Sequence, residues 1–353
     1  MAARLRDQPA IAVDTEFVWD RTYYARLGLV QLGVADGRSF LVDPCAVNDL
    51  SPIGEILADD RITKILHDAQ QDLAILHRAT GAFPRNIFDT RLAAGFAGLE
   101  STLSLSNLLI PLLDVHLPKA HTRADWIKRP LAQPLLEYAA DDVRYMPRLA
   151  DILRERACAA GTEAWLDEEL ATLDNPELYQ ERALETVYLR LRGAASLPAR
   201  GLAVLRELAA WLEKEARKID LPRRWLMEDK ELISIARVCP QTRDDLQRCE
   251  KLKSRTAQRH GPALLAAVQS ALALPDDALP SPLLPSTPPS SIKAKVAAAL
   301  EHVRARAAHH KVDPQLICSK GDLIALLHPA AKNTPHPLQQ GWRASLLDLS
   351  SIG

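Results

Sequence analysis

The stretch IAVDTEFVWDRTYYARLGLVQLGVADGRSFLVD, residues 11–43, decides the fold of this chain. Apolar and β-branched side chains alternate over about 11–17, 25–35 and 38–43, which is typical of β-strands. An Asp-Gly pair at 36–37 is a favoured hairpin turn between the last two segments. The stretch therefore predicts three strands in meander order at the start of a domain.

The next segments alternate between helix and strand signals. TKILH at 63–67 predicts a fourth strand, and the helical spacing from Ala69 to Thr80 ends at Gly81, a residue suited to a helix C-cap. A short helix is expected near 52–58, a short fifth strand at 86–89, and mainly helix from 90 to 158 with an irregular stretch at 117–134. This order predicts a mixed five-stranded sheet with helices packed on it.

Beyond residue 160 leucine, alanine and arginine recur at helical spacing, so we expect an all-α remainder. The segment PDDALPSPLLPSTPPSS contains six prolines, which favour an extended linker between two separate helical modules. The predicted division is a catalytic α/β domain at 1–165, a helical linker at 166–196, a first module at 197–274, a proline-rich linker at 275–291 and a second module at 292–353.

Acidic side chains within the apolar segments are the first functional signal. Asp14 and Glu16 are two positions apart on a strand, so both leave the same face while Thr15 leaves the other. Carboxylates in a strand are costly when buried and unpaired. The pair therefore indicates either a cation site or a strand end open to water.

Three more residues extend this signal. Asp72 lies early in a predicted helix, where the helix dipole favours a carboxylate, so a simple capping role is the alternative to a metal ligand. Tyr138 and Asp142 in LLEYAADDVRYM are i and i+4 and share one helical face, although Tyr138 also suits a helix core. The neighbouring Asp141, offset by about 100° around the axis, is the rival of Asp142.

Together these motifs resemble the DEDD family of 3′-to-5′ exonucleases, in the branch with tyrosine in the third motif. The D-x-E motif matches Asp14 and Glu16, the second-motif aspartate matches Asp72, and Y-x-x-x-D matches Tyr138 and Asp142.

Within that branch the chain resembles the ribonuclease D group over about residues 11–150. The sequence departs from the family pattern at Gln71, just before the second-motif aspartate, where family members often have an acidic residue. That residue is not a metal ligand in the family. The segments that carry the resemblance are VDTEFVWDRTYYARLGLVQL, ITKILHDAQQDLAIL, FDTRLAAGF, ADWIKRPL and LEYAADDVRYM.

The resemblance implies a fold and a chemistry. The fold would be an α/β ribonuclease H-like (DnaQ-like) exonuclease domain with a mixed five-stranded sheet. The four carboxylates would hold two divalent ions, Mg²⁺ or Mn²⁺, about 4 Å apart, and Tyr138 would orient the attacking water. The product would be nucleoside 5′-monophosphate, released one residue at a time from a 3′ hydroxyl end.

Three residues near these motifs are candidates for contact with nucleic acid. Thr15 lies between the two motif carboxylates, and Phe17 directly after them suits either base stacking or a hydrophobic core. Arg129 is a candidate partner for a backbone phosphate.

The stretch LAVLRELAAWLEKEARKIDLPRRWLMEDKELISIARVCPQTRDDLQRC resembles the HRDC domain, a small all-α helical bundle, and residues 292–353 resemble a second, divergent copy. Its basic side chains suit RNA phosphates, although a solvated helix face explains them equally well. These candidates are Lys214, Arg217, Lys218, Arg223 and Arg224.

Charge and composition agree with this division. Residues 1–160 carry 18 Lys/Arg against 21 Asp/Glu, whereas 198–273 carry 15 against 10 and 291–353 carry 8 against 4. An acidic catalytic part joined to basic modules fits a metal-dependent enzyme that binds a polyanion, although ordinary surface variation would produce the same counts. The five cysteines form no CxxC pair, so neither a disulfide framework nor a zinc site is indicated.

No apolar stretch approaches a membrane span, and the charged start lacks the core of a signal peptide, so we expect a cytoplasmic protein without membrane contact. The leading hypothesis is a monomeric exoribonuclease that trims RNA with a free 3′ hydroxyl end, such as tRNA precursors. The alternatives are a DNA 3′-to-5′ exonuclease in repair or proofreading, and an RNA-binding scaffold whose catalytic site has decayed. No residue in the sequence distinguishes RNA from DNA, because that choice depends on contact with the 2′-hydroxyl.

Overall fold

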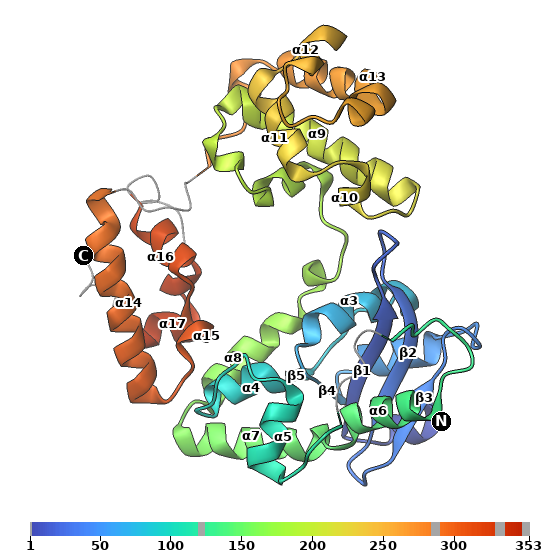
Figure 1. Cartoon of the computed structure of the whole chain (residues 1–353). Coiled ribbons are helices and arrows are strands. Elements are labelled where there is room, and N and C mark those ends of the chain that lie inside the picture. Colours follow the sequence, from blue (N-terminus) through green and yellow to red (C-terminus); the bar gives the residue numbers. More distant parts are fainter. Residues whose placement is uncertain (1, 119–123, 284–289, 329–335, 348–353) are drawn as a thin grey trace. The chain divides into compact units, whose positions relative to one another are not determined.

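A computed structural model describes residues 2–118, 124–283, 290–328 and 336–347 (Figure 1). The chain divides into two compact units. The unit that contains the predicted catalytic motifs, called the catalytic unit below, comprises the described parts of residues 1–18, 26–180 and 288–353. The helical unit comprises those of 19–25 and 181–287. No helix in the described part of the chain is both long and apolar enough to span a membrane.

The catalytic unit is built on a five-stranded mixed sheet of order β3-β2-β1-β4-β5. The first three strands are antiparallel neighbours, as the meander pattern predicts, and β4 and β5 run parallel to β1. All five strands predicted from the sequence are confirmed, with ends shifted by one or two residues. They are β1 (Ala10–Val18), β2 (Arg26–Gly33), β3 (Ser39–Val42), β4 (Thr63–Leu66) and β5 (Ile87–Asp89).

Helices surround this sheet. The predicted helix after β4 ends at Gly81, whose φ of 74° lies in the left-handed region that glycine adopts without strain. The helices are α1 (Ala2–Arg6), α2 (Ser51–Ala58), α3 (Ala69–Thr80), α4 (Thr90–Phe96), α5 (Leu105–Leu113), α6 (Gln133–Arg144), α7 (Met146–Ala160) and α8 (Glu163–Ala171).

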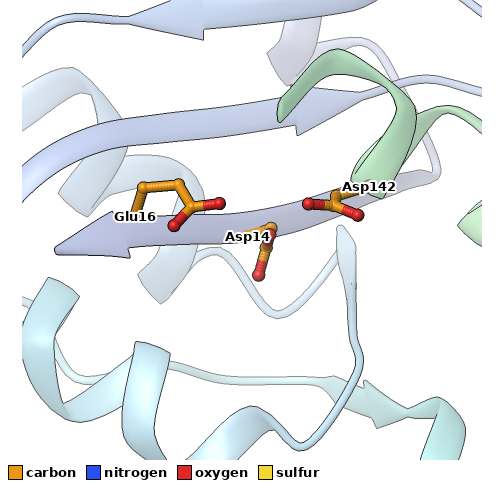
Figure 2. A group of neighbouring side chains, drawn as sticks. All are labelled: Asp14, Glu16 and Asp142. Carbon is orange, nitrogen blue, oxygen red and sulfur yellow. The ribbon is translucent and has the colours of Figure 1, made fainter. Parts of the chain in front are cut away.

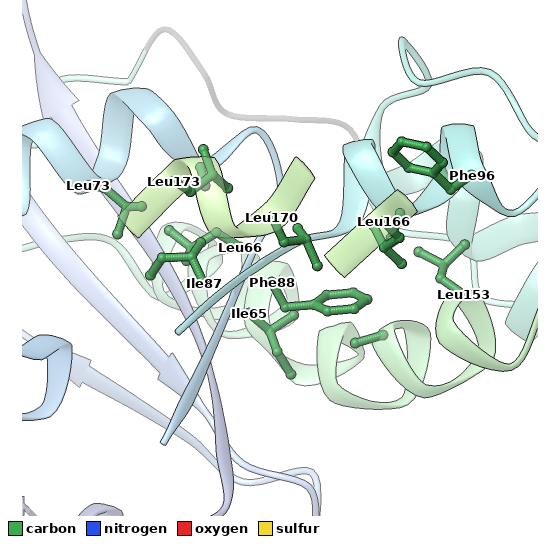
Figure 3. Close-up of a cluster of buried hydrophobic side chains, with 14 of the residues drawn as sticks. Ile65, Leu66, Leu73, Ile87, Phe88, Phe96, Leu153, Leu166, Leu170 and Leu173 are labelled. Atoms are coloured by element: carbon green, nitrogen blue, oxygen red, sulfur yellow. The ribbon is translucent and has the colours of Figure 1, made fainter. Parts of the chain in front are cut away.

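Helix α6 packs closely on strand β2. A Cβ added at Gly33 would lie 2.5 Å from the carbonyl oxygen of Val143, so only glycine permits this approach. The opposite side of the core lies between β4, β5, α3, α7 and α8. Figure 3 shows part of it, with labelled side chains Ile65, Leu66, Leu73, Ile87, Phe88, Phe96, Leu153, Leu166, Leu170 and Leu173.

The C-terminal module shares this hydrophobic core, which the sequence pattern did not predict. Its Trp342 is 2% exposed and packs against Phe96 and Trp165, at ring-centroid distances of 5.1 and 6.0 Å. The buried Asp313 carboxylate accepts hydrogen bonds from the backbone N–H and hydroxyl of Ser101, at 2.6 and 2.7 Å. The elements of this module are α14 (Ser290–His310), α15 (Pro314–Ile317), α16 (Lys320–Leu327), η7 (Pro337–Gln339) and α17 (Gly341–Leu346).

The helical unit has its own core. The loop at 19–25 belongs to it, because the Asp220 carboxylate accepts hydrogen bonds from the backbone N–H groups of Tyr23 and Tyr24, at 3.1 and 3.2 Å. Its principal helices are α9 (Ala199–Lys218), α10 (Arg223–Leu226), α11 (Asp229–Val238), α12 (Arg243–Gln247) and α13 (Ser254–Leu272), preceded by the 3₁₀ turns η3 (Leu184–Arg190) and η4 (Ala194–Ser196). Part of the predicted proline-rich linker, residues 284–289, lies outside the described residues.

The two helical modules share one succession of elements. In each, a long helix is followed by a residue in the left-handed region, Asp220 (φ 49°) or Lys311 (φ 54°), then by a helix of four residues and a longer helix. The longer helices bury equivalent leucines, Leu232 and Leu323, each 0% exposed. This geometry supports the hypothesis of a second, divergent copy, although residues 329–335 and 348–353 of that copy lie outside the described part of the chain.

Candidate active site

Three carboxylates from β1 and α6 converge. The ligand oxygens of Asp14, Glu16 and Asp142 all lie within 4.8 Å of one another (Figure 2). The alternation of side chains along β1 places Asp14 and Glu16 on one face, and α6 presents Asp142 to that face. Two segments far apart in sequence therefore form one acidic group.

Asp72 lies beside this group in the first turn of α3 but outside its tight cluster. Thr15, on the other face of β1, donates its hydroxyl hydrogen bond to the Asp72 carboxylate. Asp72 is still close enough for its charge to raise the pKa of Asp14. The structure thus places three carboxylates together and the fourth next to them.

The start of α3 is held by a carboxylate that is not itself in the group. Asp89 is buried, and its oxygens accept hydrogen bonds from the backbone N–H groups of Asp68, Ala69 and Arg91, at 3.2, 2.8 and 2.8 Å. These contacts fix the first turn that carries Asp72. Asp89 therefore positions the turn from which Asp72 projects.

Tyr138 lies one turn before Asp142 on α6 and shares a hydrogen bond with that carboxylate. Its ring packs near Trp126, with centroids 6.2 Å apart. Burial, followed by the charges of Asp142 and Glu16, raises the pKa of Tyr138 above its usual value. Tyr138 therefore remains a neutral hydrogen-bond donor at physiological pH and cannot serve as a general base.

The two neighbouring aspartates of α6 have different partners. Asp141 forms an ion pair with Arg144 at 2.5 Å, one turn further along the helix. Asp142 instead joins Asp14 and Glu16. The structure thus favours Asp142 over Asp141 as the third-motif aspartate.

All four carboxylates have raised pKa values. Burial, then the charges of Asp72, Asp142 and Glu16, raises the pKa of Asp14 well above its usual value. Burial is also the largest cause for the others, raising the pKa of Glu16 to about 8, of Asp142 to about 7 and of Asp72 to about 6. Four carboxylates this close cannot all ionise without cations, and oxygen-only donors suit Mg²⁺ or Mn²⁺. The donor set fits the implied metals.

The three sequence-predicted nucleic-acid contacts near the motifs have different surroundings. Thr15 is buried and its hydroxyl is engaged by Asp72, whereas Phe17 is half-buried. Arg129 bonds both oxygens of Asp43, at 2.7 and 2.6 Å, and three backbone carbonyls. The structure gives Arg129 a structural role in place of the predicted phosphate contact, because its guanidinium is already saturated.

The five basic candidates of the helical unit fall into two groups, those paired with carboxylates of the unit and those that are exposed. Arg217 pairs with Glu181 at 2.8 Å and stacks over the Tyr23 ring, and Arg223 lies between Glu213 and Asp229 at 3.5 and 3.3 Å. These two guanidiniums are therefore used within the unit. The remaining candidates are exposed: Lys214, Lys218 and Arg224.

Sequence reasoning missed Gln31, a fully buried amide in β2 that faces Asp14 across the strand pair. The available signal was a single polar residue inside the apolar run LGLVQLGV. An amide in such a run needs a polar partner.

Comparisons with known proteins agree with the geometry. Residues 1–157 match the family described as 3′-5′ exonuclease, and residues 201–268 match the HRDC domain. Ribonuclease D of Desulfotalea psychrophila is 39% identical over 340 residues, covering 96% of this chain and 91% of that protein. Ribonuclease D of Escherichia coli is 35% identical over 353 residues, covering 97% and 92%. The crystal structure described as Escherichia coli RNase D, an exoribonuclease involved in structured RNA processing, superposes with a TM-score of 0.89 at 32% identity, covering 99% of this chain and 94% of that one.

Proposed function

The chain belongs to the ribonuclease D family of 3′-to-5′ exoribonucleases, and from this premise we propose that it trims 3′ extensions of structured RNA such as tRNA precursors. It would act as a cytoplasmic monomer on a free 3′ hydroxyl end and release nucleoside 5′-monophosphates. The observation that carries the proposal is the convergence of Asp14, Glu16 and Asp142, with Asp72 adjacent, in a chain that matches these relatives over nearly its full length.

We assign the ligands of two divalent ions from the positions of the carboxylates. Glu16, Asp142 and Asp14 would hold one ion, and Asp14 with Asp72 would hold the other. Such ions, Mg²⁺ or Mn²⁺, supply charge neutralisation at the scissile phosphate and a nucleophilic water at neutral pH. Because its phenol stays protonated, Tyr138 would donate a hydrogen bond that orients the attacking water.

The helical unit would bind the body of the RNA. A groove of about 670 Å³ lies along α11, and exposed basic side chains outnumber the two acidic ones, Asp229 and Glu250, in its lining. Such a surface favours a polyanion. The basic lining residues are Arg192, Lys230, Arg237, Arg248 and Lys251. Exposed Lys214, Lys218 and Arg224 remain candidates for further phosphate contacts.

One assay tests the function and its DNA alternative. Matched RNA and DNA strands with the same 3′ extension are incubated with the full chain and Mg²⁺, and the products are resolved over time. We expect stepwise loss of single nucleotides from the RNA, formation of 5′-monophosphates, and no release in EDTA. Faster degradation of the DNA strand would support the alternative exonuclease, and release that persists in EDTA would contradict the metal assignment.

The raised pKa of Glu16 predicts a stability effect in the metal-free protein. Its folded pKa, about 8, lies above the unfolded value of 4.5, so the folded state binds more protons between these values. Stability should therefore fall as pH rises through this window in EDTA. Glu16→Gln removes this penalty and should stabilise the metal-free chain at pH 8 by about 1–3 kcal/mol.

Thermal unfolding in EDTA at pH 5 and pH 8 measures this effect. The gain from Glu16→Gln should be smallest at pH 5, where Glu16 is protonated in the folded wild type, and largest at pH 8. With saturating Mg²⁺ the wild type should become the more stable protein, because the variant has lost a ligand. A gain that is equal at both pH values would contradict the explanation from ionisation.

A further inference from the structure

Gln31 lies in the middle of β2 and is 0% exposed, yet neither its side-chain nitrogen nor its side-chain oxygen has a hydrogen-bond partner among the residues that the structure describes. A buried polar group left unpaired costs about 1–3 kcal/mol. An apolar residue of the same volume would avoid this cost. The residues around Gln31 indicate why an amide is present at this position.

The strand register places Gln31 directly opposite Asp14 on β1 and Leu41 on β3. Directly opposite residues of antiparallel strands project from the same face, with Cβ atoms about 4.5–5.5 Å apart. Gln31 thus shares the sheet face that carries Asp14 and Glu16. The register therefore pairs Gln31 with a member of the acidic group.

The neighbours along β2 show what covers this position. Gly33 lies against the backbone of Val143 in α6, and Leu29 clusters with Ala139 of the same helix. Both are two positions from Gln31 and therefore share its face. Gln31 consequently lies between the sheet and the helix that carries Asp142.

The residues directly opposite Gln31 include one partner for the amide. Across the strands it faces Leu41 and Asp14, and the same-face neighbours just described are apolar. Ser39, diagonal to it on β3, already donates its hydroxyl to the carbonyl of Ala140 at 2.9 Å. Of the two residues directly opposite Gln31, Asp14 is the one that offers a side-chain acceptor for its N–H groups.

We propose that Gln31 is a positioning residue for the metal centre: when cations hold Asp14 ionised, the Gln31 amide donates a hydrogen bond to the Asp14 carboxylate and sets which of its oxygens face the cations. The inference rests on the proposed function, because it takes Asp14 as the carboxylate shared by both ions. Groups that orient metal ligands in this way typically change metal affinity or activity by 10–100-fold when they are lost.

The test is Gln31→Met, which keeps the volume and removes both polar atoms. Mn²⁺ binding is measured on the full chain without RNA, by calorimetry and by electron paramagnetic resonance, and thermal unfolding is measured in EDTA. We expect Mn²⁺ affinity to fall about 10-fold or more while metal-free stability is unchanged or raised. Leu41→Met, which alters packing on the other side of Gln31, is the matched control and should bind Mn²⁺ like the wild type.

The outcomes separate this inference from the proposed function. If the wild type binds Mn²⁺ and Gln31→Met binds it equally well, the positioning role is overturned and the metal centre stands. If the wild type binds no Mn²⁺, the metal centre itself fails. A Gln31→Met protein that is destabilised in EDTA would show that the amide has a partner in the metal-free fold, which also contradicts the proposal.

Discussion

Replacing Asp142 with asparagine should abolish nucleotide release, whereas the same change at Asp141 should leave most of the activity. Asp142 lies with Asp14 and Glu16 in the group of oxygens within 4.8 Å, while Asp141 is paired with Arg144. The two substitutions are chemically identical and occupy adjacent positions of one helix. They therefore separate the role of the carboxylate from any general effect on α6.

The expected magnitude follows from the charge at the metal centre. Removing a single group that stabilises developing charge costs about 10²–10³ in kcat, and losing a metal ligand should cost at least as much. Asp141→Asn removes a half-buried ion pair, with the Asp141 side chain 22% exposed and that of Arg144 41% exposed, and we expect this to cost about 1 kcal/mol of stability. Initial rates of nucleotide release from a short 3′-extended RNA measure the first effect, and both variants should remain folded and bind RNA. Equal losses of activity would overturn the assignment of Asp142.

Replacing Trp342 with alanine should destabilise the catalytic unit by about 3–5 kcal/mol, the usual cost of removing a buried aromatic side chain. Trp342 packs on Phe96 and Trp165, and its indole N–H donates to the Glu169 carboxylate at 2.8 Å. The substitution leaves a cavity at the centre of the contact between the C-terminal module and the sheet domain. We therefore expect lower thermal stability together with loss of cleavage at temperatures that the wild type survives.

Trp225→Ala is the matched control, since Trp225 is 56% exposed and its loss should change stability by no more than about 0.5 kcal/mol. Thermal and denaturant unfolding measure both variants. If Trp342→Ala unfolded like the wild type, the shared core would not contribute to stability. Deleting the C-terminal module would expose Phe96 and Trp165 of the catalytic unit. A loss of RNA binding after this deletion would therefore not separate a binding role of the module from a loss of stability.

Much of the secondary structure of the catalytic domain could be predicted from local sequence patterns. Side-chain direction alternates along a strand and repeats about every 3.6 residues along a helix, so strands, the D-x-E pair and the Tyr138–Asp142 face were predictable from spacing alone. Gly81 and the Asp-Gly turn worked as signals because they need backbone conformations that few residues adopt. These signals depend on neighbours in sequence.

Charge patterns were a weaker guide. Arg129, Arg217 and Arg223 were predicted to contact nucleic acid, but the fold engages all three with carboxylates of the chain itself. A basic residue on a helix or loop has the same sequence signature whether its partner is a phosphate or a buried carboxylate. Only the positions of distant acidic residues distinguish the two cases.

The sequence by itself determined the succession of strands and helices along the catalytic domain, the end of α3 at Gly81 and the residue types of the candidate metal centre, because these follow from periodicity and backbone preference within short segments. The tertiary structure decided three other things: that Asp142 and not Asp141 joins Asp14, that Gln31 lies beneath α6, and that Trp342 completes the catalytic core. Each depends on contacts between residues far apart in the chain. Such contacts are set by the packing of whole elements, which no local pattern specifies.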